Sequence, residues 1–479
     1  MTETNSRRNN WWIISGMTLL TIVWFGAVIA TPGVALADPP NRDPNPRDPA
    51  FGSQGRVTIP FDLGGDWNDR GNAIVRIPGT GQLVIAGQVT SASGVAGESD
   101  FGIAMLNPDG TLEPGFGNVD DGLTVHSFGT PETDAAWDLV PVLQGTPPEW
   151  RLLVVGQTQQ TGSSDIDTGL MYLKPDGMLD LLAPHNGRYI VGWPLTDRLT
   201  AAATFDDQRS AVVAGTSETA TGTDWFFFKI GENFDVNVVY YDSISFTDVA
   251  TLEDVATYSD GKVVAAGSVD YHGDARMIVA RMTPDGILDI DFGTDGLVEI
   301  EVDFDGAADD RAFGVAVDTE DRAIVVGTIG TDDGPMLFMT RLTWTGAVDT
   351  DFGNNGYVWM QSMGCEATEA RDVVLDPVGT IVIAYEVSCS GNRDFRINRF
   401  DQAGQYIEGW SIPFDEITNG DDRPQGITAL PDGKIVVAGR VQSVTSDLDF
   451  GVAEVTTDVI FAEGFESKGW WGADWNWSP

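Results

Sequence analysis

A short apolar run that usually ends in glycine recurs seven times, and this repetition limits the possible fold more than any other feature. The first run is Leu83-Val-Ile-Ala-Gly87, and the seven final positions are Gly87, Gly156, Gly215, Gly267, Gly327, Tyr385 and Gly439. Successive final positions lie 52 to 69 residues apart. A period of this length, with several short strands in each copy, indicates a repeat architecture rather than one asymmetric core.

Each copy contains β-rich runs separated by turn residues. In the first copy the pattern predicts strands at 72–77, 83–87, 101–106 and 123–128. The segment Asn107-Pro-Asp-Gly110 between the third and fourth runs is typical of a tight turn. None of these runs has a helical period. The copies therefore predict four-stranded antiparallel sheets.

The two ends of the array predict how it closes. The seventh set of strands, ending near Val455, lacks a fourth strand, whereas residues 55–61 form such a strand before the first complete set. If the N-terminal strand completes the last sheet, no sheet edge stays open. We therefore expect an all-β fold over residues 48–458, a seven-bladed β-propeller closed by the N-terminal strand. Six or eight blades remain alternatives.

Several segments resemble the bacterial delta-60 repeat family. They include Leu288-Asp-Ile-Asp-Phe-Gly-Thr-Asp-Gly296 and the similar segments 281–286, 348–356 and 430–439. The resemblance covers about 85 per cent of the chain, and one copy departs from it by having Pro184-His-Asn-Gly187 where Phe-Gly is expected. The resemblance implies a β-propeller in secreted or surface proteins. It supplies no catalytic residues.

The chain ends predict an exported protein. Residues 1–37 have the form of a signal peptide, with Arg7 and Arg8 before an apolar stretch and a small-residue cleavage pattern at 35–37. An uncleaved anchor is the alternative, because the apolar stretch is long enough to cross a bilayer. After cleavage we expect no membrane insertion, and a secreted, periplasmic or cell-surface location.

Two short segments flank the predicted propeller. Residues 38–47 form a proline-rich linker. Residues 459–479 contain four tryptophans and resemble a short terminal segment of secreted proteobacterial proteins. These tryptophans suit stacking on sugars or docking on a partner, but they also suit covering one end of the ring.

The formal net charge of −45 excludes some classes of partner. Nucleic acids and anionic membranes require a basic surface, so neither is expected as a ligand. The acidic residues are interleaved with apolar strands, which fits a strongly hydrated exterior of a folded, monomeric protein.

The only two cysteines, Cys365 and Cys389, flank one predicted hairpin. Its turn falls near Pro377-Val378, so the numbers of residues that face each other sum to about 755. This register places the two sulfurs nearly opposite each other. In an exported protein the pair predicts a disulfide, with a metal pair or two free thiols as alternatives.

Strand alternation predicts a face for binding. The connections from second to third strand, and from fourth strand to the next blade, share one side of the ring and are the longer ones. We call this side the long-loop face. Four acidic residues recur there at equivalent positions, namely Asp69, Asp134, Asp310 and Asp422. They are either backbone acceptors that fix the loops or part of a surface that binds a ligand or cations.

A cofactor is not required by the sequence, although calcium is a candidate. The segment 303–310 places Asp303, Asp305 and Asp309 near a glycine, a composition that suits the oxygen ligands of calcium. The segment lacks the spacing of a known calcium loop. A calcium site here is a hypothesis.

Catalytic motifs are lacking in this sequence. The three histidines lie in three different repeats, and no His-Glu-x-x-His, Gly-x-Ser-x-Gly or phosphate loop occurs. We therefore expect a non-catalytic propeller that binds, or forms a scaffold for, protein or glycan. The alternative is a secreted hydrolase or lyase with a carboxylate pair on the long-loop face. A buried pair with a raised pKa would favour that alternative.

Overall fold

The protein is described by a computed structural model. The described residues are 47–61, 68–90, 97–119, 121–129, 133–159, 165–192, 195–232, 239–240, 243–302, 309–331, 334–360, 367–389, 391–414, 420–442 and 447–456. The predicted signal peptide, most of the linker and the tryptophan-rich tail lie outside these ranges. No helix within them is long and apolar enough to span a bilayer.

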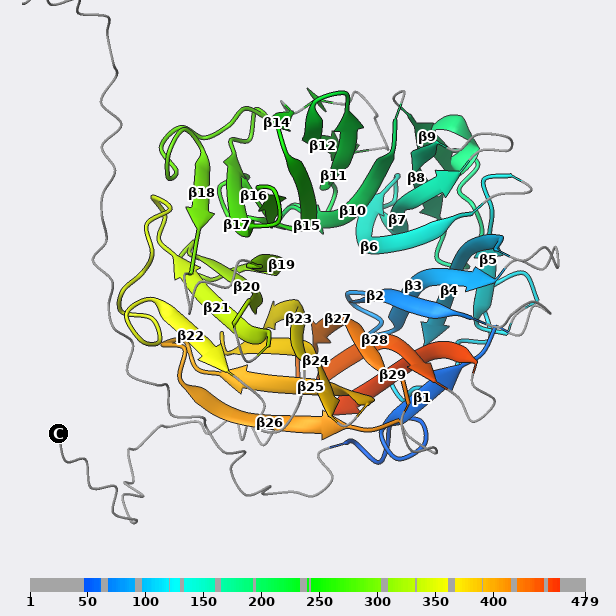
Figure 1. The fold of residues 1–479 in the computed structure, drawn as a ribbon. Helices are drawn as coiled ribbons and strands as arrows, with labels where there is room; N and C mark the ends of the chain where they lie inside the picture. The colour runs from blue at the N-terminus through cyan, green and yellow to red at the C-terminus, as the bar shows by residue number, and fades with distance from the viewer. Residues whose placement is uncertain are drawn as a thin grey trace, which may run out of the picture. The chain divides into compact units, whose positions relative to one another are not determined.

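The described strands form seven antiparallel sheets around a common centre (Figure 1). We number the sheets as blades 1 to 7 in chain order. Blade 1 contains β2 (Arg70–Arg76), β3 (Leu83–Thr90), β4 (Ser99–Leu106) and β5 (Leu123–His126); blade 2 contains β6 (Ala135–Gln144), β7 (Glu149–Gln159), β8 (Ile166–Leu173) and β9 (Arg188–Val191). Blade 3 contains β10 (Asp197–Thr204), β11 (Ala211–Thr219), β12 (Gly222–Ile230), β13 (Val239–Tyr240) and β14 (Ile244–Phe246).

The remaining blades follow the same plan. Blade 4 contains β15 (Val249–Thr257), β16 (Val263–Asp270), β17 (Ala275–Met282) and β18 (Leu297–Ile300); blade 5 contains β19 (Arg311–Val317), β20 (Ala323–Ile329), β21 (Met336–Leu342) and β22 (Tyr357–Met360). Blade 6 contains β23 (Ala367–Leu375), β24 (Ile381–Cys389), β25 (Asn392–Phe400) and β26 (Tyr406–Ile412). Blade 7 contains β27 (Arg423–Ala429), β28 (Ile435–Gln442), β29 (Leu448–Val455) and, from the start of the propeller, β1 (Arg56–Ile59). The predicted seven-bladed all-β propeller is confirmed.

Blade 7 closes the ring as predicted. Strand β1 pairs antiparallel with β29, and Val57 lies opposite Val452. The Lys434 ammonium adds an ionic link, since its Nζ lies 2.6 Å from a carboxylate oxygen of Asp48 and 2.9 Å from one of Glu454. The first and last parts of the propeller are therefore joined by both backbone pairing and charge.

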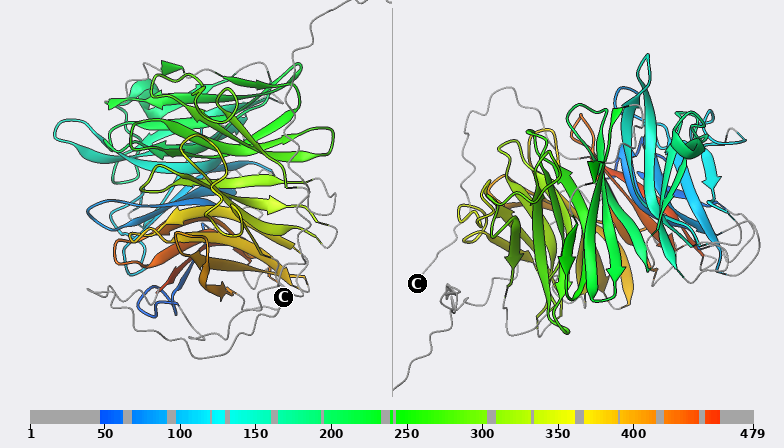
Figure 2. Two further views of the ribbon diagram at one scale, coloured as in Figure 1. Left: turned by 90° about the vertical axis from the view of Figure 1, so that its left-hand side faces the viewer. Right: turned by 90° about the horizontal axis from the view of Figure 1, so that it is seen from above.

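The blades are held together by apolar cores between neighbouring sheets, which pack face to face (Figure 2). The recurring apolar run of the sequence forms the second strand of each blade. In β3 the residues from Leu83 to Gly87 are all buried, because both faces of the strand are covered. A strand buried on both faces reads as a continuous apolar run rather than an alternating one.

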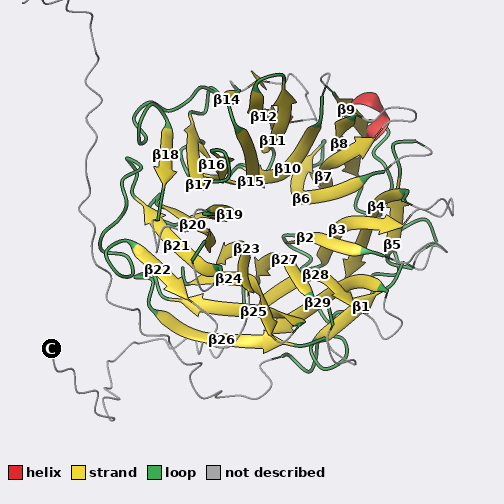
Figure 3. Ribbon diagram, in the orientation of Figure 1, coloured by secondary structure: helices red, strands yellow, loops and turns green. Residues whose placement is uncertain are grey.

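The phenylalanine and glycine of the repeat motif link one blade to the next on the side opposite the long-loop face. The phenylalanines are almost fully buried: Phe51, Phe116, Phe292 and Phe352. The glycine that follows donates its N–H to the next blade, as Gly293 does to the Thr345 carbonyl at 2.8 Å. In the divergent copy, Pro184–Gly187 forms the short helix η1 seen in Figure 3, with left-handed φ angles at His185 and Asn186, and leads into β9.

Strand ends differ from the sequence prediction by a few residues. Strand β2 begins at Arg70 rather than 72, and β3 continues to Thr90 rather than ending at 87. The Asp69 carboxylate accepts the N–H of Thr90 at 3.1 Å, which holds the end of β3 against the start of β2. Such a side-chain contact between two strands cannot be predicted from the hydrophobic periodicity of either strand.

The hairpin of the cysteines has the predicted register. Its turn is closed by a bond from the Gly379 N–H to the Asp376 carbonyl, and Ala367 pairs with Ser388, so that facing residues sum to 755. Cys389 ends β24. Cys365 lies outside the described residues, so the disulfide remains a prediction.

Peptide mapping by mass spectrometry tests that pairing. Without reduction, proteolysis of the full chain should yield one linked peptide pair containing Cys365 and Cys389, and reduction should separate it. Recovery of both thiols in alkylated form before reduction would contradict the disulfide.

The closing contact predicts a cost for truncating Phe51, which is 1 % exposed. Phe51→Ala should lower the free energy of unfolding by about 3–5 kcal/mol, because it removes a buried ring and leaves a cavity. Denaturant unfolding measures the change. Val119→Ala is the control, since Val119 is 74 % exposed and its truncation should change stability by less than about 0.5 kcal/mol. Equal effects of the two substitutions would show that the N-terminal copy does not contribute to the closing core.

Candidate functional site at the inner strands

The first strand of every blade lies innermost in the ring and carries one β-bulge at the same position (Figure 1). A bulge leaves one residue without a partner and redirects side chains. The seven extra residues, which we call the bulge residues, are Asn72, Trp137, Thr200, Glu253, Phe313, Arg371 and Gln425. They are of seven different types, whereas the apolar run of the second strand recurs in every blade.

The glycines that end the recurring apolar runs, which we call the landmark glycines, face these bulges. Gly87 lies opposite Gly71, directly before the bulge of β2, and a Cβ atom on Gly87 would lie 1.8 Å from the Arg70 carbonyl oxygen. The same close approach occurs at Gly156, Gly215, Gly267, Gly327 and Gly439, with distances of 1.8 to 2.0 Å. This close approach accounts for the glycine in these six blades. Tyr385 takes this position in blade 6.

The residue after each bulge alternates between aspartate and a small residue around most of the ring. The series is Ala73, Asp138, Ala201, Asp254, Gly314, Asp372 and Gly426. Each aspartate accepts the N–H of the residue after it and a second N–H from the next blade. The second donors are Ala202 at 2.7 Å, Val315 at 2.8 Å and Ile427 at 2.9 Å. The three aspartates thus join blades 2 to 3, 4 to 5 and 6 to 7.

Two bulge residues make the corresponding links at other junctions. Asn72 donates from Nδ2 to the Ala136 carbonyl at 2.7 Å, and Thr200 donates from Oγ1 to the Leu252 carbonyl at 2.8 Å. These contacts join blades 1 to 2 and 3 to 4. Asn72 and Thr200 therefore have a structural role that explains their polarity. The other bulge residues are not explained by such a link.

Burial and mutual repulsion set the charge state of the inner aspartates. Burial raises the pKa of Asp138 to about 8, against the N–H bond from Ala202, and the nearby Asp254 raises it further. Burial likewise raises the pKa of Asp254 to about 7. Burial, followed by repulsion from Asp254 and Asp138, raises the pKa of Asp372 well above its usual range. The three carboxylates of blades 2, 4 and 6 therefore lie close enough to interact.

The four acidic residues singled out in the sequence lie where the long loops enter the first strands. All are buried, and their carboxylates accept backbone N–H groups. Oδ2 accepts from the end of the preceding blade: Phe61 at 3.1 Å for Asp69, Phe128 at 2.8 Å for Asp134, Val302 at 2.9 Å for Asp310 and Phe414 at 3.3 Å for Asp422. These contacts agree with the interpretation of the four residues as backbone acceptors. Asp197, which is buried, takes the same place in blade 3.

The calcium hypothesis is only partly covered by the structure. Asp303 and Asp305 lie outside the described residues. The Asp309 carboxylate forms an ion pair with Arg311 at 2.8 Å, and 61 % of its side chain is exposed. No group of three potential metal ligands occurs among the residues that the structure describes. Calcium binding stays a prediction.

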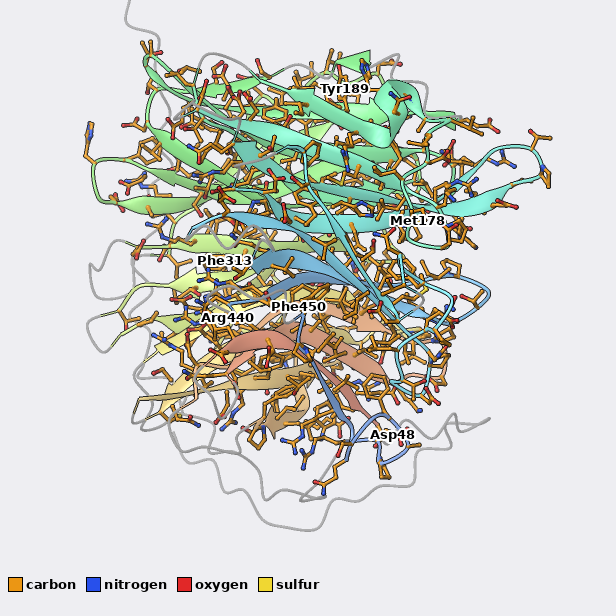
Figure 4. All side chains as sticks on the ribbon, turned by 90° about the vertical axis from the view of Figure 1, so that its right-hand side faces the viewer. Asp48, Met178, Tyr189, Phe313, Arg440 and Phe450 are labelled. Carbon is orange, nitrogen blue, oxygen red and sulfur yellow. The ribbon has the colours of Figure 1, made fainter. Side chains whose placement is uncertain are left out.

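Arginines gather at the long-loop ends of the inner strands, although the chain as a whole is strongly acidic. Four first strands have arginine three residues before the post-bulge position: Arg70, Arg198, Arg311 and Arg423. Arg371 is the bulge residue of blade 6, and Arg440 pairs with Arg423 across β27 and β28. In the side view of Figure 4, Phe313 and Arg440 lie toward one face of the ring, and Met178 and Asp48 toward the other.

Comparisons with known proteins support the fold but not a specific activity. A family model described as a domain of unknown function (DUF5122) beta-propeller matches residues 79–116, 259–292 and 430–458. These matches support a propeller repeat family. No curated protein matches the chain.

Solved structures similar to this chain are distant from it. Sqt1 from Chaetomium thermophilum is 15% identical, with 84% of this chain and 89% of that chain covered and a TM-score of 0.45. The polysaccharide lyase Uly1 is 9% identical, with 81% and 90% covered and a TM-score of 0.44. A GH43 endo-arabinanase from Bacillus licheniformis is 15% identical, with 54% and 94% covered and a TM-score of 0.29. Likeness at this level carries no argument about function.

The bulge residues and the inner aspartates were not singled out from the sequence. The sequence does contain a reference point for finding them, because the recurring aspartates allow the copies to be aligned. Asp138 follows Asp134 by four residues, and Gly314 follows Asp310 by four residues. Aligning the seven copies at this position would have revealed one column with seven residue types beside a column of only aspartate, alanine and glycine. Local strand patterns do not reveal a bulge, so the column had no evident meaning.

The raised pKa of Asp138 predicts a pH dependence for Asp138→Asn. An unfolded aspartate titrates near pH ~4, so between about pH 4 and pH 8 the folded state holds a proton that the unfolded state releases. This contribution to stability is lost as the pH rises towards 8. Asparagine resembles the neutral form, so the loss of stability caused by the substitution should be smaller at pH 8 than at pH 5.

Denaturant unfolding at both pH values measures this difference. Asp109→Asn is the control, because hydrogen bonds from Thr111 lower the pKa of the exposed Asp109 carboxyl and its effect should not change between pH 5 and pH 8. A penalty for Asp138→Asn that is constant or grows towards pH 8 would contradict the proposed charge state.

Proposed function

We propose that this protein is an exported, non-catalytic binding propeller that recognises a protein or glycan at the long-loop ends of its inner strands. The observation that carries the proposal is the variation at one repeated position, where no hydrogen bond to the next blade is seen for five of the seven bulge residues among the described residues: Trp137, Glu253, Phe313, Arg371 and Gln425. In a repeat array, residues needed for the fold recur from copy to copy, as the landmark glycines do. A position that differs in every copy, on a bulge that redirects its side chain, is suited to recognition.

The exposed surface of these residues supports binding. Trp137 is 38 % exposed, and its indole N–H donates to the Gln157 side chain at 3.2 Å. Phe313, the bulge residue of blade 5, is half-buried, and the Arg371 guanidinium lies 5.6 Å from the centroid of its ring. Aromatic rings with a polar or charged neighbour provide large contact areas at binding surfaces.

The raised pKa values of the inner aspartates favour the alternative, a hydrolase or lyase, since buried carboxylates with raised pKa serve as general acids. Against it, both oxygens of Asp138, Asp254 and Asp372 already accept backbone N–H groups. A different cavity of about 260 Å³, between blades 5 and 6, has no carboxylate in its lining of Gly353, Asn354, Tyr357, Val358, Trp359, Met360, Phe400, Gly404, Gln405 and Tyr406. These hydrogen bonds argue against Asp138, Asp254 and Asp372 as catalytic groups and so support binding.

A binding screen with one matched pair of variants tests the proposal. The secreted full chain is screened against a glycan array and a panel of extracellular proteins, and any ligand found is titrated against Trp137→Ala. We expect affinity to fall at least tenfold with little change in stability, because the indole is exposed. Leu182→Ala, at a residue 96 % exposed on the opposite face, should bind as the wild type does.

Two results would contradict this assignment. One is a ligand whose affinity is unaffected by Trp137→Ala and by Phe313→Ala. The other is release of reducing ends or unsaturated sugars from a polysaccharide, abolished by Glu253→Gln or Asp254→Asn, which would establish the enzyme alternative.

A further inference from the structure

Four arginines meet between blades 6 and 7 at the long-loop face. We call Arg371, Arg393, Arg423 and Arg440 the arginine cluster. Asp421 lies among them and accepts from Arg393 at 2.8 Å, from Arg423 at 2.9 Å and from Arg440 at 2.8 Å. The cluster joins the bulge of β23 to the starts of β25 and β27 and to the end of β28.

Four carboxylates face this cluster of four arginines. Besides Asp421 they are Glu369, which lies 2.5 Å from Arg371, Glu386, which is 2 % exposed and lies 3.0 Å from Arg371, and Glu253, which is close enough to interact with Arg371. Arg70 of blade 1 adds a further positive charge, close enough to affect Arg440. A local excess of positive charge is unexpected in a chain with a formal charge of −45.

The arginines have hydrogen-bonding capacity left over. The Nε–H groups of Arg371, Arg393 and Arg440 are buried and have no hydrogen-bond partner among the residues that the structure describes. A buried charged donor without an acceptor is costly. Burial lowers the pKa of the Arg440 guanidinium, and repulsion from Arg423 and Arg70 lowers it further, against the attraction of Asp421. An anion bound beside these guanidinium groups would relieve the repulsion among them.

The position of the cluster beside the bulge residues indicates what carries the anion. Arg371 is itself a bulge residue and lies over the ring of Phe313, and Gln425 is the bulge residue of the next strand. A planar guanidinium fork matches a carboxylate, an aromatic ring covers the face of a sugar, and an amide bonds to hydroxyl groups. An acidic protein surface fits less well, because its extended negative charge would meet the negative charge of the whole chain.

We propose that the arginine cluster is a subsite for the carboxylate of an acidic sugar, so that the ligand of this propeller is a uronate-containing oligosaccharide. This inference rests on the proposed binding function and specifies its ligand. Glu386 and Asp421 orient the guanidinium groups, and Phe313 contacts the sugar ring next to the carboxylate.

Titration with a matched pair of probes tests the inference. An otherwise neutral oligosaccharide that carries one galacturonic acid, and the same oligosaccharide with that carboxylate methyl-esterified, are added to the full chain, and binding is followed by calorimetry at 0.15 M salt. The free acid should bind at least tenfold more tightly than the ester and should raise the melting temperature of the wild type. Its affinity should fall at higher salt, since the contact is ionic.

Variants then locate the site. Arg371→Gln and Arg440→Gln should each weaken binding of the acid at least tenfold and weaken binding of the ester much less, so that the preference for the acid over the ester falls. Arg209→Gln removes the same charge from a turn on the opposite face and should have no effect. The melting-temperature shift of the wild type does not depend on whether the variants fold.

The outcomes separate this inference from the proposed function. Equal binding of acid and ester, lost in Trp137→Ala, would overturn the carboxylate subsite and leave the binding function in place. Failure of the acid to bind at millimolar concentration, or binding unaffected by both arginine substitutions, would overturn the subsite. Preference for a glutamate-rich peptide over the acidic oligosaccharide would overturn the choice of ligand.

Discussion

The bulge in the first strand of each blade is the local feature on which the rest of this structure depends. It brings the carbonyl of a residue such as Arg70 so close to the second strand that a Cβ at Gly87 would lie 1.8 Å away. The bulge therefore accounts for the glycine that marks six of the seven copies. It also redirects the following residues, so that one side chain in each blade is released from strand pairing.

The ring uses part of that freedom for its own stability. Asn72 and Thr200 donate to carbonyls of the next blade, and Asp138, Asp254 and Asp372 accept N–H groups from it. Donor and acceptor links thus alternate around much of the ring. The aspartates sit close together, so burial and mutual repulsion favour the protonated form, whereas the N–H groups that their oxygens accept favour the ionised form. A hydrogen bond in such surroundings is strong when satisfied and costly when it is not.

Most of the architecture could be predicted from the sequence, because a propeller repeats its local rules seven times. The seven blades, the closing strand and the hairpin register around Pro377-Val378 all follow from spacing and turn residues. The candidate site could not be predicted in the same way. Asp69 and Asp422 recur, and so attracted attention, but recurrence marks their structural role as backbone acceptors. The informative positions, such as Trp137 and Arg371, are those that fail to recur, and strand pairing shows why they are equivalent: each is the extra residue of a bulge.

The net charge of the chain differs from the local charge at the junction of blades 6 and 7. A formal charge of −45 argues against anionic ligands, and the argument is valid for large anionic surfaces that must approach the whole chain. The argument is not valid within a Debye length of ~8 Å at physiological salt, because the nearest charged groups determine the local potential there. At the junction of blades 6 and 7 those groups are Arg371, Arg393, Arg423 and Arg440, with Asp421 shared among three of them. The overall negative charge then acts as a filter, because it repels extended polyanions and leaves the cluster to a ligand that presents single carboxylates on an otherwise neutral scaffold.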